Sequence, residues 1–257
     1  MKKQMAPQHR LPWSLPIDRD EFILGQCERQ RVLHLACASA PFTRKLHASG
    51  QLLHDKMRER TAEIYGVDID RQALSYLESN GFHHLIAADL LDRWDVDGIS
   101  QRLPWIPDVV LAGELLEHLD QQGLALTNIS RLLGPESKLV ITVPNSFSIK
   151  SFLRVCVGHE KVAHDHVSYF SYVNLKELVG RAGLQVDQVA WYTSSFVSTH
   201  PLERLFDRLI WPALAIRPQL SDGIVVVCTL KTSRQRSTFS TVGATQVDSE
   251  FSTQEVS

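Results

Sequence analysis

The chain has 257 residues, of which 44% are hydrophobic and 22% charged, and its formal net charge is −2. This composition fits one soluble globular domain, gives no basic footprint for binding nucleic acid, and contains no apolar run as long as the roughly 18 residues of a membrane span. Its 4 cysteines are scattered without a Cys-x-x-Cys pair, which suits a reducing compartment, so we expect a cytoplasmic protein.

Apolar runs of strand length alternate with stretches of helical periodicity along most of the chain. Strands are predicted at 31–36, 62–67, 83–88, 107–113, 138–143, 185–192 and 223–230. Helices are predicted at 17–30, within 41–60 as one or two short helices, and at 71–79, 95–102, 121–133, 175–182 and 202–216. This alternation predicts an α/β fold, a doubly wound and mostly parallel sheet of seven strands with helices on both faces.

The ends of the chain differ in composition from its middle. Residues 1–16 contain three prolines and no periodicity, which predicts a flexible arm, and they lack the apolar stretch of a signal peptide. Residues 232–257 are rich in Ser, Thr, Gln and Val, again without periodicity, which predicts a disordered tail. One folded domain is therefore expected over 17–231.

A string of small residues, Ala36 to Ala40, follows the first predicted strand and precedes Pro41. Small residues let the backbone approach a ligand closely. A loop of this kind usually carries glycines, but none occurs here between Gln26 and Ser49. The segment predicts one wall of a ligand site.

Two acidic residues stand where predicted strands end, Asp68 after 62–67 and Asp89 after 83–88. In an open parallel sheet the carboxyl ends of the strands line the ligand crevice. A carboxylate there can accept the hydroxyls of a ribose, and one on the next strand can reach an adenine amino group. The alternative is that each acid caps the helix that follows it.

This succession resembles the class I S-adenosylmethionine-dependent methyltransferases. In that family the first strand ends in an acid and three alternating glycines, the second in Gly-x-Asp, the third in Asp, and the fourth leads into Glu-x-x-Glu-His. Here the second and fourth motifs read Gly66-Val-Asp68 and Glu114-Leu-Leu-Glu117-His118. Segments 131–145 and 166–183 are also similar, so the resemblance covers about 31–230 and implies the Rossmann-like fold of the small-molecule branch.

The resemblance implies S-adenosylmethionine as cofactor and also implies which residues hold it. The first loop would face the methionine end, Asp68 the ribose and Asp89 the adenine amino group, while Glu114 would lie beside the methionine moiety. The implied cofactor-binding residues are His34, Ala36, Cys37, Ala38, Asp68, Ile69, Asp89, Leu90 and Glu114. The acceptor would bind elements at about 145–175 and 193–222.

The first loop departs from the family pattern. His34 stands where the acid usually helps to fix the cofactor's ammonium group, and Ala36, Ala38 and Ala40 replace the three glycines. Alanine adopts positive φ at a cost of roughly 1 kcal/mol per position. We therefore expect a weaker or differently shaped hold on the cofactor.

Methyl transfer would be a direct displacement that depends on alignment and on exclusion of water. A hydroxyl or phenol acceptor would be helped by a general base, for which the candidates are His118, His164 and His166. For His118 the alternative is a helix residue that holds a backbone or carboxylate partner. No metal site is expected, because His159, His164, Asp165 and His166 lack a tight ligand spacing.

The acceptor is expected to be a small molecule, either a sugar or a phenolic or quinone-like ring. One alternative function is a non-catalytic, methyltransferase-like binding or regulatory module. Another, a nicotinamide-dependent dehydrogenase, is disfavoured because the Gly-x-Gly-x-x-Gly motif is missing. Leu205, Leu209 and Ile210 fall on one stripe of helix 202–216, which favours packing on the sheet over an acceptor lid or a membrane-surface helix. A homo-oligomer is left open.

Overall fold

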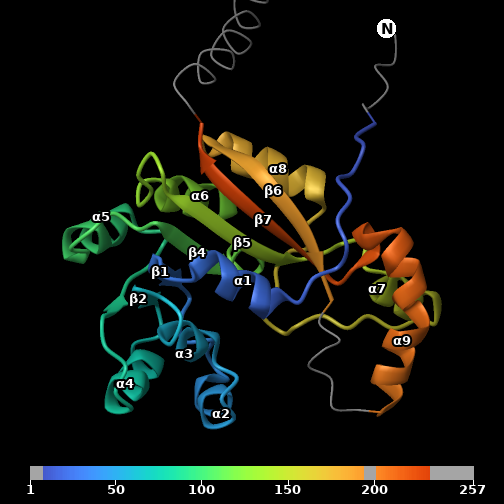
Figure 1. Cartoon of the computed structure of the whole chain (residues 1–257), viewed down its shortest axis with the longest axis horizontal. Helices are drawn as coiled ribbons and strands as arrows, with labels where there is room; N and C mark the ends of the chain where they lie inside the picture. Colours follow the sequence, from blue (N-terminus) through green and yellow to red (C-terminus); the bar gives the residue numbers. More distant parts are fainter. Residues whose placement is uncertain (1–7, 194–200, 232–257) are drawn as a thin grey trace, which may run out of the picture.

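The computed structural model describes residues 8–193 and 201–231, in which strands alternate with helices (Figure 1). The strands are β1 (Arg31–Leu35), β2 (Glu63–Asp68), β3 (Leu85–Ala87), β4 (Val109–Gly113), β5 (Lys138–Pro144), β6 (Leu184–Tyr192) and β7 (Gly223–Leu230). The helices are α1 (Arg19–Cys27), α2 (Thr43–Ala48), α3 (Leu53–Arg58), α4 (Arg71–Ser79), α5 (Arg93–Arg102), α6 (Gln122–Ser130), α7 (Ile149–Cys156), α8 (Tyr172–Arg181) and α9 (Pro201–Ile216). Two 3-10 turns are η1 (Leu116–His118) and η3 (Pro218–Leu220).

The strands form a 7-stranded sheet in the order β3-β2-β1-β4-β5-β7-β6. Strands β1 to β5 pair in parallel, whereas β7 runs antiparallel to both β5 and β6. The predicted seven-stranded, mostly parallel sheet is confirmed, and the helix at 71–79 and the strand at 223–230 have the predicted bounds. The antiparallel direction of β7 was not part of the prediction.

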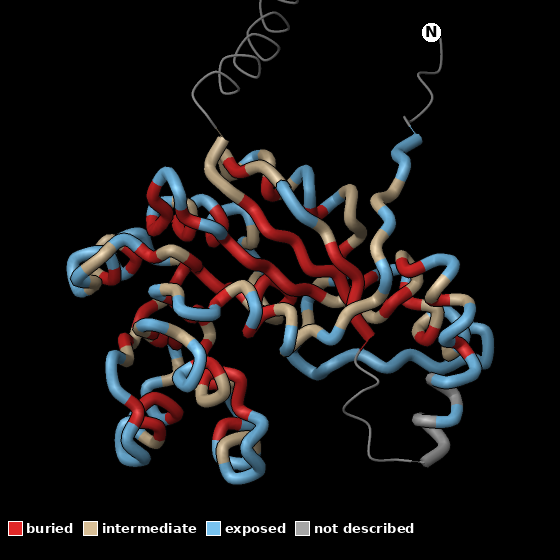
Figure 2. Tube along the Cα trace, in the orientation of Figure 1, coloured by how far each residue is buried: buried red, intermediate tan, exposed pale blue. Residues whose placement is uncertain are grey.

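Apolar side chains cover both faces of the sheet, so the fold is doubly wound as predicted. On one face α5, α6 and α8 pack through residues such as Ile99, Leu126 and Val179. On the other face α1 and α3 pack through Ile23 and Met57. The buried chain is concentrated in the central strands, and the helices around them expose their outer sides (Figure 2). Each parallel strand is followed, at its carboxyl end, by a loop.

The structure departs from the predictions in two outer segments. Helix α7 lies in a stretch for which no helix was predicted; its apolar residues Phe152 and Val155 are exposed. Helix α9 was predicted, and of the three stripe residues named above Ile210 is buried, as is Leu214 one turn further along, whereas Leu205 and Leu209 are exposed. The prediction that this stripe packs on the sheet is therefore wrong for Leu205 and Leu209.

Residues 8–16 contain no helix or strand, but they are attached to the domain. The Pro12 carbonyl accepts hydrogen bonds from Trp191 Nε1 at 3.3 Å and from Gln219 Nε2 at 2.7 Å. The rest of the predicted arm and the predicted tail at 232–257 lie outside the described residues. No helix in the described part of the chain is long and apolar enough to cross a bilayer.

Candidate active site

The parallel strands β1, β2, β3 and β4 deliver four loops to one edge of the sheet. Leu35, the last residue of β1, is level with Val67 of β2 and with Ala112 of β4. Asp68 is level with Ala87 of β3. Because the strands are parallel and in register, the residues that follow them emerge together, as expected of a ligand crevice in an open α/β sheet.

The loop after β1 is held by its backbone. The Cys37 amide donates to the Val67 carbonyl at 3.1 Å, and the Ala38 amide donates to Asp68 Oδ2 at 2.9 Å. Ala36 has a φ of +53°, so one of the three replaced glycines does impose a left-handed alanine. Ala38 and Ala40 do not, whereas Ser39 has a φ of +54° that the sequence did not indicate. The conformational cost of losing the glycines therefore falls on one alanine.

Two of the predicted loop contacts to the cofactor have inward-facing side chains. Cys37 and Ala38 are both fully buried, and burial together with Asp68 raises the pKa of the Cys37 thiol. A Cβ at Gly66 would lie 2.6 Å from Cys37 Sγ and 2.8 Å from Leu85 Cδ2. The glycine in β2 is thus required by the Cys37 side chain, and only the backbone of Cys37 and Ala38 is left to face a ligand.

His34 is also turned away from the loop. It is 3% exposed, and its Nδ1 lies 3.1 Å from Nδ1 of the fully buried His54 of α3, with the two rings stacked. Burial, His54 and the Arg19 charge lower the pKa of His34 well below its usual value. Burial and Arg58 lower the pKa of His54 to about 4. Both rings are neutral near pH 7, so His34 offers no charge where the family has an acid.

At the end of β2 a buried acid, Asp68, is followed by an exposed apolar residue, Ile69. Asp68 is 8% exposed, and its two oxygens accept the amides of Ala38 and Asp70, each at 2.9 Å. A carboxylate has about four acceptor positions, so two remain for ligand hydroxyls. Ile69 is 67% exposed, which is unusual for an isoleucine. Its exposed apolar surface suits one face of an aromatic base.

Asp89 follows β3 and is half-buried, whereas Leu90 is buried. The Asp89 Oδ1 accepts the Leu91 amide at 2.8 Å, leaving Oδ2 for another donor. The alternative that Asp68 and Asp89 cap the following helices is wrong. Helix α4 is capped by Asp70, and α5 is capped by Asp92.

Glu114 follows β4 with a φ of +48°. Its Oε1 accepts hydrogen bonds from Thr142 Oγ1 at 2.9 Å and from the Tyr192 hydroxyl at 2.5 Å, and Arg19 lies 4.0 Å away. A non-glycine residue held at positive φ is typical of a site where the surrounding structure fixes a side chain. The alternative of a solvated residue just past a strand is not what the structure has, since three side chains from other elements hold this carboxylate.

Glu117, His118 and His166 come together beside Glu114. One ligand atom from each of the three lies within 4.8 Å of the others, and the two histidine rings meet edge to face with centroids 4.7 Å apart. Burial and the Glu114 carboxylate raise the pKa of Glu117 to about 9, so its carboxyl is protonated near pH 7. Burial and His118 lower the pKa of His166. His118 Nδ1 lies 3.1 Å from Asp165 Oδ2, whereas His164 is exposed and is not a member of the cluster.

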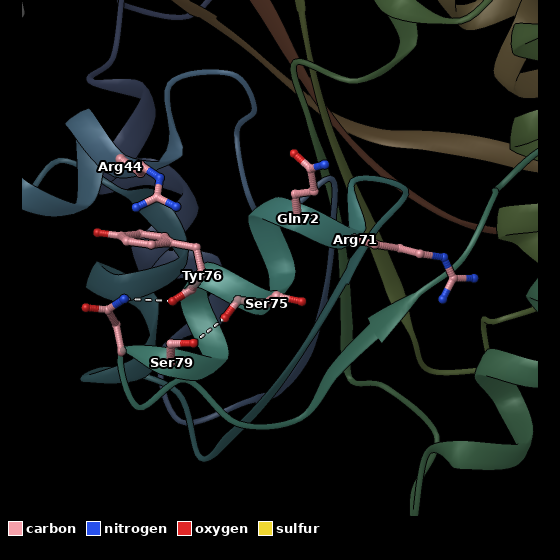
Figure 3. A pocket seen from close by; sticks show the side chains of 7 residues that line it. Arg44, Arg71, Gln72, Ser75, Tyr76 and Ser79 are labelled. Carbon is pink, nitrogen blue, oxygen red and sulfur yellow. Dashed lines mark hydrogen bonds between the residues drawn. The ribbon is translucent and has the colours of Figure 1, made fainter.

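A pocket outside this edge opens along α2 and α4 (Figure 3). Its lining residues are Arg44, Arg71, Gln72, Ser75, Tyr76, Ser79 and Asn80. The Arg44 guanidinium lies 4.3 Å from the centre of the Tyr76 ring, and Asn80 Nδ2 donates to the Tyr76 carbonyl at 2.7 Å. None of the predicted site residues lines this pocket, so the candidate site remains the carboxyl edge of the sheet.

Sequence reasoning missed the side chains that fix the carboxylates. Arg19, Thr142 and Tyr192 all contact Glu114 from elements distant in the chain. Arg19 gave no signal, because it belongs to none of the motifs that the sequence offers. Tyr192 gave a weak one, because a polar aromatic residue follows the apolar run 189–191 at the end of a predicted strand.

Over residues 15–189 the chain matches a protein family described as a methyltransferase domain. It is 23% identical over 204 residues to a ubiquinone biosynthesis O-methyltransferase of Burkholderia vietnamiensis, and the alignment covers 77% of each chain. It is 26% identical over 145 residues to the enzyme of the same name from Vibrio atlanticus, over 53% of this chain and 60% of that one.

Solved structures share the fold at low sequence identity. A Haloferax volcanii chain, solved in a complex between the Trm112 methyltransferase activator and a methyltransferase, gives a TM-score of 0.52 at 14% identity, covering 82% of this chain and 88% of that one. The [4+2]-cyclase SpnF gives a TM-score of 0.50 at 14% identity, covering 83% of this chain and 81% of that one. Since one of these is named as a cyclase, the shared fold alone does not identify a reaction.

Proposed function

The chain belongs to the methyltransferase domain family, and on that premise we propose that it transfers the methyl group of S-adenosylmethionine to the hydroxyl of a small phenolic or quinone-like acceptor. The enzyme class and the cofactor follow from the family. The acceptor is the proposed part, and it is supported by similarity to proteins named as ubiquinone biosynthesis O-methyltransferases. A sugar acceptor has no comparable support.

The observation that carries the cofactor assignment is the pairing of Asp68 with Ile69 at the end of β2. Asp68 keeps acceptor positions for the two ribose hydroxyls, and Ile69 offers an exposed apolar side chain for the adenine face. Asp89 Oδ2 on the next strand would accept from the adenine amino group. When bound, the cofactor supplies an electrophilic methyl group on a sulfonium.

The methionine end would lie over the first loop and beside Glu114. With His34 neutral and turned inward, Glu114 is the acid left to attract the cofactor's ammonium group. Its Oε1 is occupied by Thr142 and Tyr192, so Oε2 is the oxygen available to a ligand. The backbone of Ala36 to Ala38 would exclude water from the methionine chain.

The acceptor would bind on the side of the site that holds His118 and His166. Both rings are partly exposed and meet edge to face, and His166 lies within the electrostatic influence of Glu114, whereas the exposed His164 lies two residues earlier in the same loop. The segments after β5 expose large apolar side chains, among them Phe147 and Phe152, each more than 60% exposed. An acceptor with an apolar ring or tail suits this surface better than a sugar does.

The cofactor part of the proposal is tested with Ile69→Ala, because an exposed side chain can be truncated without disturbing the fold. We expect the dissociation constant for S-adenosylmethionine, measured by calorimetry, to rise about tenfold, the equivalent of about 1.4 kcal/mol of lost apolar contact. Ile106→Ala is the matched control, because Ile106 is 60% exposed and lies before the opposite end of β4. Equal affinity in the two variants would contradict the assigned adenine position.

The acceptor part is tested by transfer of a labelled methyl group to a panel of phenols, hydroxyquinones and sugars, with excess demethylated cofactor as the inhibited control. We expect methylated phenols or hydroxyquinones and faster transfer to acceptors with an apolar tail. Transfer to sugars alone, or to none of the panel by a protein that binds the cofactor, would refute the proposed acceptor class.

A further inference from the structure

The pocket along α2 and α4 has a positively charged lining (Figure 3). Its volume is about 750 Å³, which is within the range of small-molecule sites. The described residues that line it include two arginines and no acid. Figure 3 shows Arg44 at one end of the lining and Arg71 at the other, with Gln72 and Ser75 between them. Clefts lined by one sign of charge attract ligands of the opposite sign, so this lining favours an anion.

Both arginines have donors that the fold does not use. Within residues 8–193 and 201–231, neither Arg44 nor Arg71 forms an ion pair or donates a hydrogen bond. The Arg44 guanidinium lies over the Tyr76 ring, 4.3 Å from its centre. Such a contact uses the face of the guanidinium and leaves the N–H groups in its plane for other acceptors.

Arg58 of α3 shows what an arginine with a purely structural role looks like in this fold. It lies over the Phe82 ring in the same way, also 4.3 Å from the ring centre. Its guanidinium in addition donates to the Gly81 carbonyl at 3.0 Å and lies 3.5 Å from Asp55. Arg44 has the ring contact without these partners, so it is held in position while its donors stay available to a ligand.

Two polar side chains between the arginines also have donors available. The Ser79 hydroxyl and the Asn80 side-chain amide donate to carbonyls of α4 itself, at 2.8 and 2.7 Å. The side chains of Gln72 and Ser75, by contrast, form no hydrogen bond with any described residue. Two amides in the first turn of α4 are already capped by Asp70. An anion in this pocket would therefore be bound by side chains and not by the helix N-terminus.

We propose that this pocket binds a small molecule with two phosphate groups, one at Arg44 and the other at Arg71. A guanidinium can donate two parallel hydrogen bonds to a phosphate, which carries more charge and more acceptor oxygens than a carboxylate. Gln72 and Ser75 would donate to the part of the ligand between its phosphates. None of the residues assigned to the cofactor or the acceptor lines the pocket, so this ligand binds together with the cofactor. The site does not depend on the proposed function.

The test is calorimetry on the full chain with two probes, fructose 1,6-bisphosphate and inorganic phosphate. We expect one equivalent of the bisphosphate to bind, about tenfold more tightly than phosphate, because it engages both arginines. Arg44→Gln and Arg71→Gln should each weaken bisphosphate binding about tenfold, the loss of one charge-assisted pair. Saturation with the demethylated cofactor should leave the affinity for the bisphosphate within about twofold, as expected of separate sites.

Arg102→Gln is the matched control, because Arg102 of α5 is exposed and lies outside the pocket lining. It should bind the bisphosphate as wild type does, and thermal melting without ligand shows that each variant is folded. The proposal is overturned if wild type does not bind the bisphosphate, or if Arg102→Gln weakens binding as much as Arg44→Gln. Displacement of the bisphosphate by the demethylated cofactor would overturn it too. Equal affinity for the two probes, unchanged in Arg71→Gln, would show an adventitious ion only.

Discussion

The buried pair His34 and His54 should make the stability of this protein depend on pH. The pKa of His54 is lowered from 6.5 to about 4, while an unfolded histidine titrates near the ordinary value. Between these two values the unfolded chain binds more protons than the folded one. The free energy of unfolding is therefore highest above pH 6.5 and falls, as the pH falls toward 4, by about 1.4 kcal/mol per unit. His54 alone accounts for about 3 kcal/mol over this window, and His34 adds to it in the same direction.

The variant His54→Gln isolates this contribution, because glutamine can still hydrogen-bond His34 Nδ1 but does not titrate. Urea unfolding followed by tryptophan fluorescence gives the free energy of unfolding at pH 7 and at pH 5. Wild type should lose about 2 kcal/mol more than the variant between these values. Between pH 7.5 and 8.5 the difference between the two proteins should stay constant, which serves as the internal control. Equal losses at pH 5 would refute the reasoning.

Two further substitutions test packing and the hold on Glu114. Gly66→Ala should lower the free energy of unfolding by about 2–3 kcal/mol, because its Cβ would lie 2.6 Å from Cys37 Sγ. The control is Gly25→Ala in α1, whose Cβ would meet nothing within 4 Å, so this variant should be as stable as wild type or more stable. A Gly66→Ala protein as stable as wild type in urea would contradict the close packing. Tyr192→Phe should fold and lower kcat/KM for methyl transfer about tenfold, because Glu114 loses the hydroxyl at 2.5 Å that positions it; unchanged kinetics would show that Glu114 needs no such support.

The alternation of elements was predictable because each strand and most helices bury an apolar face. Helix α7 was missed for the opposite reason. Its apolar residues, such as Phe152 and Val155, are exposed. Helix α7 therefore does not bury an apolar face against the sheet, which is the property on which the other helix predictions depended. The direction of β7 could not be read either, since a fully buried strand has the same apolar pattern in both directions.

The candidate site was predictable where it follows strand ends and unpredictable where it depends on contacts across the fold. Asp68 was found from its position where a predicted strand ends, and Glu114 through the resemblance of its segment to the family's Glu-x-x-Glu-His motif. The cluster of Glu117 with His166 was not, because a docked loop brings together residues that are far apart in the chain. The inward direction of His34 depends on His54 in α3, and no local pattern in the sequence links the two.

The ring of Tyr192 lies over Gly223 of β7, where any larger residue would place a Cβ in the space that the ring occupies. The glycine therefore lets the Tyr192 side chain cross β7. From the end of β6 its hydroxyl reaches the Val143 carbonyl of β5 and Glu114 after β4. The similarity to the methyltransferase domain family stops at 189, three residues before this tyrosine. A chain shortened at residue 189 would keep Asp68, Ile69 and Asp89, which are assigned to the nucleoside. It would lose Tyr192, whose hydroxyl donates a hydrogen bond to Glu114. A shortened or swapped domain that is meant to keep the contact between Tyr192 and Glu114 should therefore end after β7 rather than within β6.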